Sequence, residues 1–239
     1  MGFKSFIKRI ILKLQSKKAI QWKGQPQQER SNRFSSNRPF PPHHLWIMCC
    51  KPDGSCQFSA LAKALAAAYG DSKISPELVR RQICDYLEQL PPESAEFEMS
   101  LETTKYSFSD STNSTLLRKV EKLTTPYDLA TYFRNPKTYG NAATLQSARQ
   151  LYDLDIFVVD SRQGNIISKV EGKEPKPNII LLIFDPYGKH FDLLCRVTYP
   201  DGNRNVQTIF SEADFKNLNL LDSSLSKLQV SMEQVPRWK

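Results

Sequence analysis

One cysteine of this sequence lies where a glycine-containing loop runs directly into a helical pattern. Apolar residues recur at helical spacing from Phe58 onward, which places Cys56 in the first turn of a predicted helix. Free backbone N–H groups and the positive end of the helix dipole favour a thiolate there, so Cys56 is a candidate nucleophile. The same amides, with those of the preceding turn, could bind the oxyanion formed on a carbonyl. The alternative is that Cys56 is a small hydrophobic residue and Asp53 is the N-terminal cap.

A cysteine nucleophile normally needs a general base, and the chain contains three histidines. His43 and His44 lie in a proline-rich polar segment that would not hold an imidazole rigidly. His190 instead opens a predicted strand over residues 190–197. Alternate side chains of a strand share a face, so Asp192 can hold one imidazole nitrogen of His190 while the other nitrogen faces a thiol. The alternative is a surface histidine beside a solvated carboxylate.

Three blocks between about residues 45 and 200 resemble the motifs of the ovarian tumour (OTU) family of cysteine proteases, and they occur in the family's order. Tyr139 and Asn141 depart from the usual Trp and second Gly of the middle block. The blocks are Asp53-Gly54-Ser55-Cys56-Gln57-Phe58-Ser59-Ala60-Leu61, Tyr139-Gly140-Asn141-Ala142-Ala143-Thr144-Leu145-Gln146-Ser147-Ala148 running to Ile156-Phe157-Val158-Val159, and His190-Phe191-Asp192.

The resemblance implies an α/β (α+β) papain-like fold, with a small central β-sheet flanked by helices. It also implies a thiol-dependent deubiquitinase that needs no cofactor and cleaves ubiquitin, polyubiquitin or a ubiquitin-like modifier from its conjugates. Cys56 would be the nucleophile, His190 the base, Asp192 the orienting group and the Asp53–Cys56 loop the oxyanion site, with Asp53 shaping that loop. Three alternatives stay open: a catalytically silent ubiquitin-binding OTU-like domain, a membrane-surface adaptor, and a different papain-like thiol hydrolase.

The positive charge of the chain is concentrated at its N-terminal end. Residues 1–52 carry eleven Lys or Arg against one acid, a net of +10, whereas the whole chain is +8 and residues 53–239 are therefore about −2. The pattern of residues 1–20 predicts a basic amphipathic helix. Its residues 1–18 are suited to contact with an anionic membrane surface. Packing of its apolar face onto the catalytic domain is the alternative. No specific nucleic acid is expected as a partner, because no aromatic-rich basic groove accompanies the arm.

The five cysteines are odd in number, include an adjacent pair and lack the spacing of a metal site. We therefore expect no metal and a reducing, cytoplasmic location, which would be the host cytosol for a pathogen protein. No apolar run reaches the roughly 18 to 20 residues of a membrane-spanning helix. The prediction is a soluble protein, with peripheral membrane attachment if the basic arm serves that purpose.

The predicted organisation is a helix over 1–20, a flexible linker over 21–44, the catalytic domain over 45–210 and a C-terminal extension of unknown role over 211–239. The polar segment 93–115 is predicted to be a mobile surface insertion, and the alternative is a surface excursion that touches the substrate. Within the domain the pattern predicts an extended segment at 45–48, helices at 58–69, 76–90, 116–123, 126–133 and 143–152, strands at 156–159, 179–184 and 190–197, and a hairpin turn at 201–202 leading to a strand at 206–210.

Overall fold

The computed structural model describes residues 45–107, 114–161, 166–170, 172, 174–198 and 205–218. The predicted amphipathic helix at 1–20, the linker at 21–44, the turn at 201–202 and residues 219–239 lie outside the described residues.

The described strands form one mixed sheet in the order β1-β5-β4-β2-β3, with β6 paired to β5 and β7 paired to β4. The β2 and β4 strands run parallel, and the other neighbours run antiparallel. The fold is therefore mixed α/β, as the sequence predicted. The strands are β1 Leu45–Met48, β2 Asp155–Asp160, β3 Ile166–Val170, β4 Asn178–Asp185, β5 His190–Thr198, β6 Asn205–Gln207 and β7 Ile209–Ser211.

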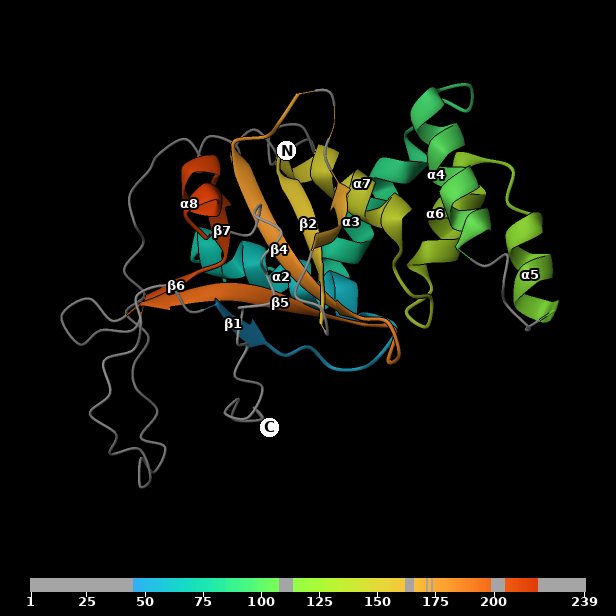
Figure 1. Cartoon of the computed structure of the whole chain (residues 1–239). Helices are drawn as coiled ribbons and strands as arrows, with labels where there is room; N and C mark the ends of the chain where they lie inside the picture. Colours follow the sequence, from blue (N-terminus) through green and yellow to red (C-terminus); the bar gives the residue numbers. More distant parts are fainter. Residues whose placement is uncertain are drawn as a thin grey trace.

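Helices cover the sheet and extend beyond one end of it. Helix α2 packs against β5, while α4, α5 and α6 gather at one end of the molecule and α8 lies near the other with β6 and β7 (Figure 1). The helices are α2 Cys56–Tyr69, α3 Pro76–Glu88, α4 Ala95–Tyr106, α5 Ser114–Glu121, α6 Pro126–Arg134, α7 Ala142–Tyr152 and α8 Glu212–Asn217.

Local capping explains where several of these helices begin. The Ser75 hydroxyl accepts a hydrogen bond from the Leu78 amide, and Thr125 forms a capping box with Asp128, each followed by proline in the first turn. Asn141 caps α7 through the amides of its first turn. The helix starts predicted at Ser75 and Thr125 are confirmed.

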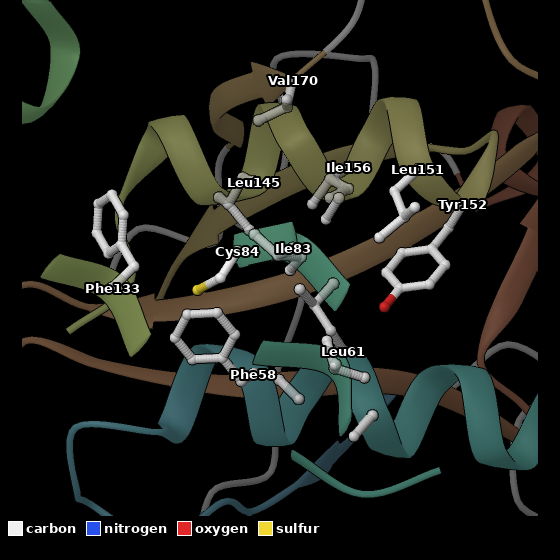
Figure 2. Packing of buried hydrophobic residues seen from close by; sticks show 14 of the residues in the cluster. Phe58, Leu61, Ile83, Cys84, Phe133, Leu145, Leu151, Tyr152, Ile156 and Val170 are labelled. Atoms are coloured by element: carbon white, nitrogen blue, oxygen red, sulfur yellow. The ribbon is translucent and has the colours of Figure 1, made fainter. Parts of the chain in front are cut away.

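The two faces of the sheet bury separate sets of apolar residues. Ile156, Ile180 and Leu193 belong to the larger core, which includes Phe58 and Leu61 of α2, Ile83 and Cys84 of α3, Phe133 of α6, and Leu145, Leu151 and Tyr152 of α7 (Figure 2). The opposite face carries Phe157 and Leu181, with Phe210 and Phe215. Strands β2 and β4 are buried on both faces, which explains their uninterrupted apolar sequences.

The prediction of a mobile insertion at 93–115 is wrong for most of that segment, because Ala95–Tyr106 forms α4 and packs against α7. Phe97, Ser100 and Thr104 are buried. Two of these three side chains are polar, and hydrogen bonds satisfy Thr104, whose hydroxyl donates to Ser100 and accepts from Asn141. The buried face is therefore not apolar enough to be read from the sequence.

The single strand predicted at 206–210 is divided between two neighbours. Asn205–Gln207 pairs with β5, whereas Ile209–Ser211 pairs with β4. Thr208, between them, is buried and donates to the carbonyl of Ala64. Helix α8 follows at once, and its Phe215 ring lies 4.7 Å from the Phe157 ring. Residues 211–218 thus belong to the folded unit, although the predicted boundary fell at residue 210.

None of the described helices is long and apolar enough to cross a membrane.

Candidate active site

The loop before α2 is held in shape by Asp53. Its Oδ1 accepts from the Ser55 amide at 2.8 Å, and its carbonyl oxygen accepts from the Cys56 amide at 3.1 Å. Ser55 is the N-cap residue, so the alternative that Asp53 caps the helix is wrong. The Ser55 side chain does not cap the helix either. Asp53 fixes the turn that brings the chain into α2 at Cys56.

Cys56 is only 2% exposed, and burial raises the pKa of its thiol above the ordinary value. The backbone amides of Phe191 and Gln57 act in the opposite direction by donating hydrogen bonds to the sulfur. The predicted preference for a thiolate at the helix start is therefore wrong for this arrangement, because desolvation outweighs the amides. A thiol held protonated in this way needs a base to activate it.

His190 and Asp192 lie in contact at the start of β5. Strand β4 turns into β5 so that His190 pairs with Asp185, and Asp192 lies two residues further along. The Nε2 atom of His190 lies 3.0 Å from Oδ1 of Asp192, which also accepts a hydrogen bond from the Cys50 amide. The two side chains therefore lie on the same face of β5, as the sequence predicted.

The second imidazole nitrogen of His190 is in a different situation. Its Nδ1 atom is buried and has no hydrogen-bond partner within the described part of the chain. An ionised carboxylate only accepts hydrogen bonds, so Asp192 favours the tautomer that carries its proton on Nε2. In that tautomer Nδ1 has a free lone pair that can accept a proton.

The cysteine and the histidine are brought together by α2 and β5. The sulfur of Cys56 accepts from the amide of Phe191, the residue between His190 and Asp192. Cys56, His190 and Asp192 therefore gather at one place, where the N-terminus of α2 meets the start of β5. His43 and His44 lie outside the described residues.

The amides available for an oxyanion are fewer than predicted. The Asp53 amide donates to the Lys51 carbonyl. The Ser55 amide donates to the Asp53 carboxylate, and the Cys56 amide donates to the Asp53 carbonyl. Among the amides of this loop, that of Gly54 has no hydrogen-bond partner within the residues that the structure describes. An oxyanion role for the loop stays a prediction, and it falls first on Gly54.

The middle sequence block lies against the helix that carries the cysteine. The Gln57 side chain is 1% exposed, and its Nε2 donates to the Asn141 carbonyl at 3.3 Å. Its Oε1 accepts from the Thr144 hydroxyl at 2.6 Å. A Cβ atom at Gly140 would lie 2.0 Å from that Oε1, so any larger residue there would displace the Gln57 side chain. Tyr139, beside Gly140, is half exposed. Gln57 thus locks the 139–141 loop beside Cys56.

Sequence reasoning missed three residues that support this site. They are Cys50, whose amide holds Asp192, Gln57, which holds the 139–141 loop, and Arg80, which contacts the nucleophile loop from α3. A signal existed for Arg80, since Ile83 and Leu87 follow it three and seven residues later on the buried helix face.

Within the described ranges, no group of three or more His, Cys, Asp or Glu side chains is placed to hold a metal ion.

No protein-family profile matches this sequence, and no curated protein sequence matches it. Solved structures of OTU domains are similar to it. An OTU domain in complex with ubiquitin is 17% identical, with a TM-score of 0.45 over 77% of this chain and 86% of that chain. The viral OTU domain protease from Farallon virus is 17% identical, with a TM-score of 0.43 over 64% and 85%. An OTU deubiquitinase from Wolbachia pipientis wMel is 14% identical, with a TM-score of 0.42 over 66% and 91%.

Proposed function

We propose that this chain is a cysteine protease that removes ubiquitin from its conjugates by hydrolysing the bond at the C-terminal glycine of ubiquitin. The observation that carries the proposal is the state of His190, whose Nε2 contacts Asp192 while its buried Nδ1 has no partner among the described residues. A histidine held in this way, next to the residue whose amide donates to the Cys56 sulfur, has the orientation of a general base.

The choice of substrate rests on the three sequence blocks that resemble the OTU family. Ubiquitin is the first substrate to test, and a ubiquitin-like modifier is the second. The reaction class rests separately on the cysteine, the histidine and the carboxylate. A failure with ubiquitin would therefore leave a thiol hydrolase of another specificity to be examined.

The first half of the reaction is acylation of Cys56. His190 Nδ1 accepts the thiol proton, and the sulfur attacks the carbonyl carbon of the C-terminal glycine. The negative charge passes to the carbonyl oxygen, and we assign its stabilisation to the Gly54 amide, the donor of this loop that has no partner among the described residues. The protonated imidazole then gives its proton to the leaving lysine amine, the C–N bond breaks and a thioester remains.

The second half is hydrolysis of the thioester. A water molecule attacks the same carbon while His190 Nδ1 accepts its proton. The C–S bond breaks, the sulfur leaves as a thiolate and recovers its proton from His190, and ubiquitin leaves with a free carboxylate. In both halves of the reaction Asp192 stabilises the imidazolium of His190 by accepting a hydrogen bond from its Nε2–H group.

The direct test uses ubiquitin that carries a thiol-reactive electrophile at its C-terminus, followed by intact mass measurement and peptide mapping. We expect one adduct, on Cys56, and none in the Cys56→Ala variant. An adduct on the exposed Cys49 instead would contradict the assignment of the nucleophile. Binding of ubiquitin without an adduct would favour the catalytically silent domain.

Two parts of the sequence hypothesis remain separate proposals. One is binding of an anionic membrane surface by residues 1–18, which flotation with anionic vesicles would test on the full chain and on a chain lacking those residues. The other is a cytoplasmic location, which rests on cysteine usage alone.

A further inference from the structure

Arg80 of α3 is a buried cation without a buried anion beside it. The residue is 6% exposed, and no carboxylate lies within ion-pair distance of it among the described residues. Arg149, the other buried arginine among the described residues, is paired with Asp155 at 2.8 Å. A buried charge that lacks a counter-ion needs several hydrogen bonds to remain in place. Those of Arg80 go to the nucleophile loop, to the last turn of α6 and to the loop that follows α6.

The guanidinium of Arg80 joins the nucleophile loop to the loop after α6. Its Nη2 donates to the Gly54 carbonyl and to the Ser55 hydroxyl, and its Nη1 donates to carbonyls of the segment 133–138. The distances are 2.7 Å to Gly54 O, 3.1 Å to Ser55 Oγ and 3.5 Å to Pro136 O for Nη2, and 2.7 Å to Phe133 O, 3.1 Å to Asn135 O and 2.9 Å to Thr138 O for Nη1. Only a planar fork with several donors can reach both loops at once.

An aromatic ring fixes the plane of this fork. The guanidinium carbon lies 4.0 Å from the centroid of the Phe58 ring, on α2 two residues after the nucleophile. Phe58 and Phe133 both belong to the larger core, where Figure 2 labels them on α2 and α6. Arg80 therefore touches the core at Phe58, the start of α2 and the end of α6.

The contact with Ser55 has a consequence for the helix start. A serine at the N-cap position usually accepts a hydrogen bond from an amide of the first turn, yet this serine does not. Its hydroxyl oxygen is oriented to Arg80 instead, and the Gln57 amide donates to the sulfur of Cys56. Arg80 thereby keeps a first-turn donor available to the nucleophile.

The contact with Gly54 limits the loop in a second way. The Gly54 carbonyl faces Arg80, and a Cβ at this position would lie 2.7 Å from the Pro136 carbonyl oxygen. The two loops are thus in direct contact at Gly54, with the guanidinium between their carbonyl groups. The segment 133–138 continues into the 139–141 loop, where the Gln57 side chain donates to the Asn141 carbonyl.

We propose that Arg80 is a positioning residue of this site, which clamps the nucleophile loop to the loop after α6 and prevents Ser55 from capping the helix that carries Cys56. The inference rests on the proposed thiol-dependent function and extends it to a residue outside the three sequence blocks. It does not depend on which modifier the protein cleaves.

The test compares Arg80→Lys and Arg80→Gln with Arg149→Lys in the full chain, at matched folding as judged by thermal unfolding. Arg149 is the control because it is 2% exposed and also holds a backbone carbonyl, that of Glu174, but it lies on α7 and contacts neither loop. Two quantities are measured: the pH dependence of Cys56 alkylation by iodoacetamide, mapped by mass spectrometry, and kcat and KM with a ubiquitin substrate.

We expect Arg80→Lys to lower kcat by about 100-fold with little change in KM, because a small displacement of the nucleophile costs rate more than binding. We expect the alkylation midpoint of Cys56 to move to higher pH by about one unit, since the released Ser55 hydroxyl competes for the Gln57 amide. Adding Ser55→Ala to Arg80→Lys should return the midpoint toward the wild-type value. Arg149→Lys should lower stability and leave the midpoint unchanged.

A folded Arg80→Lys protein with the wild-type midpoint and the wild-type kcat would overturn the inference, as would an equal shift in Arg149→Lys. If Arg80→Gln does not fold, Arg80→Lys, which keeps the charge, carries the comparison. A wild-type protein that leaves ubiquitin intact would count against the proposed substrate alone. The midpoint shift in the Arg80 variants would still support the positioning role, because iodoacetamide needs no ubiquitin.

Discussion

The Cys50 amide and the Asp192 carboxylate, 142 positions apart in the sequence, are joined by a hydrogen bond at the Oδ1 atom that also faces His190. This contact links the segment between β1 and α2 to the strand that carries the histidine. Asp192 therefore has two donors on one oxygen, which holds the carboxylate still and with it the imidazole. A carboxylate held by backbone has little freedom to release the histidine.

Asp192→Asn should lower kcat by at least about 100-fold, because the amide group can donate as well as accept and no longer favours the proton on Nε2. The Cys50 amide keeps an oxygen acceptor in this variant, so the thermal midpoint should change little. Steady-state kinetics and thermal unfolding test the two halves of the prediction. Asp214→Asn is the control, because Asp214 pairs with Arg196 further along β5. Equal losses of kcat in the two variants would show that Asp192 has no specific role in orienting His190.

Gly140→Ala should lower activity and destabilise the fold by about 1–3 kcal/mol, since the added methyl group would lie 2.0 Å from Gln57 Oε1. Gln57 cannot easily move aside, because Asn141 and Thr144 hold both ends of its amide. In a double-mutant cycle, Gln57→Ala should reduce the further cost of Gly140→Ala. Additive losses of stability would show that the two residues do not compete for this space.

Cys50 and Cys84 should resist iodoacetamide near pH 8, because burial raises the pKa of each thiol to about 12. A raised pKa lowers the thiolate fraction, which would be about one molecule in ten thousand at that pH. Labelling should increase only as the pH rises toward 12 or as the protein unfolds. The exposed Cys49 is the internal control and should be labelled at pH 8. Rapid labelling of Cys50 at pH 8 in the folded protein would contradict its burial.

Phe215→Ala should destabilise the protein by about 3 kcal/mol, because the ring is 2% exposed and packs edge-on against Phe157. The control is Tyr127→Ala, which removes an aromatic ring that is 61% exposed and should cost far less. Chemical denaturation of both variants measures the difference. A loss below about 1 kcal/mol for Phe215→Ala would mean that residues 211–218 do not contribute to the core.

Features that depend on neighbours along the chain could be predicted from the amino-acid sequence alone. Helix starts at Ser75 and Thr125 follow from hydrogen bonds that span three residues. Likewise, His190 and Asp192 meet because strand side chains two residues apart share a face. These relationships hold wherever the local element forms, so the proposed nucleophile, base and orienting group could all be named before the fold was known.

The surroundings of those residues depend on packing between segments that are distant in the sequence. Burial against β5 raises the pKa of the Cys56 thiol, whereas the position at the helix start alone predicted a lowered pKa. Arg80 reaches Gly54 across 26 positions, and Cys50 reaches Asp192 across 142. Desolvation and long-range hydrogen bonds exist only after packing brings distant segments together, so no spacing in the sequence encodes them.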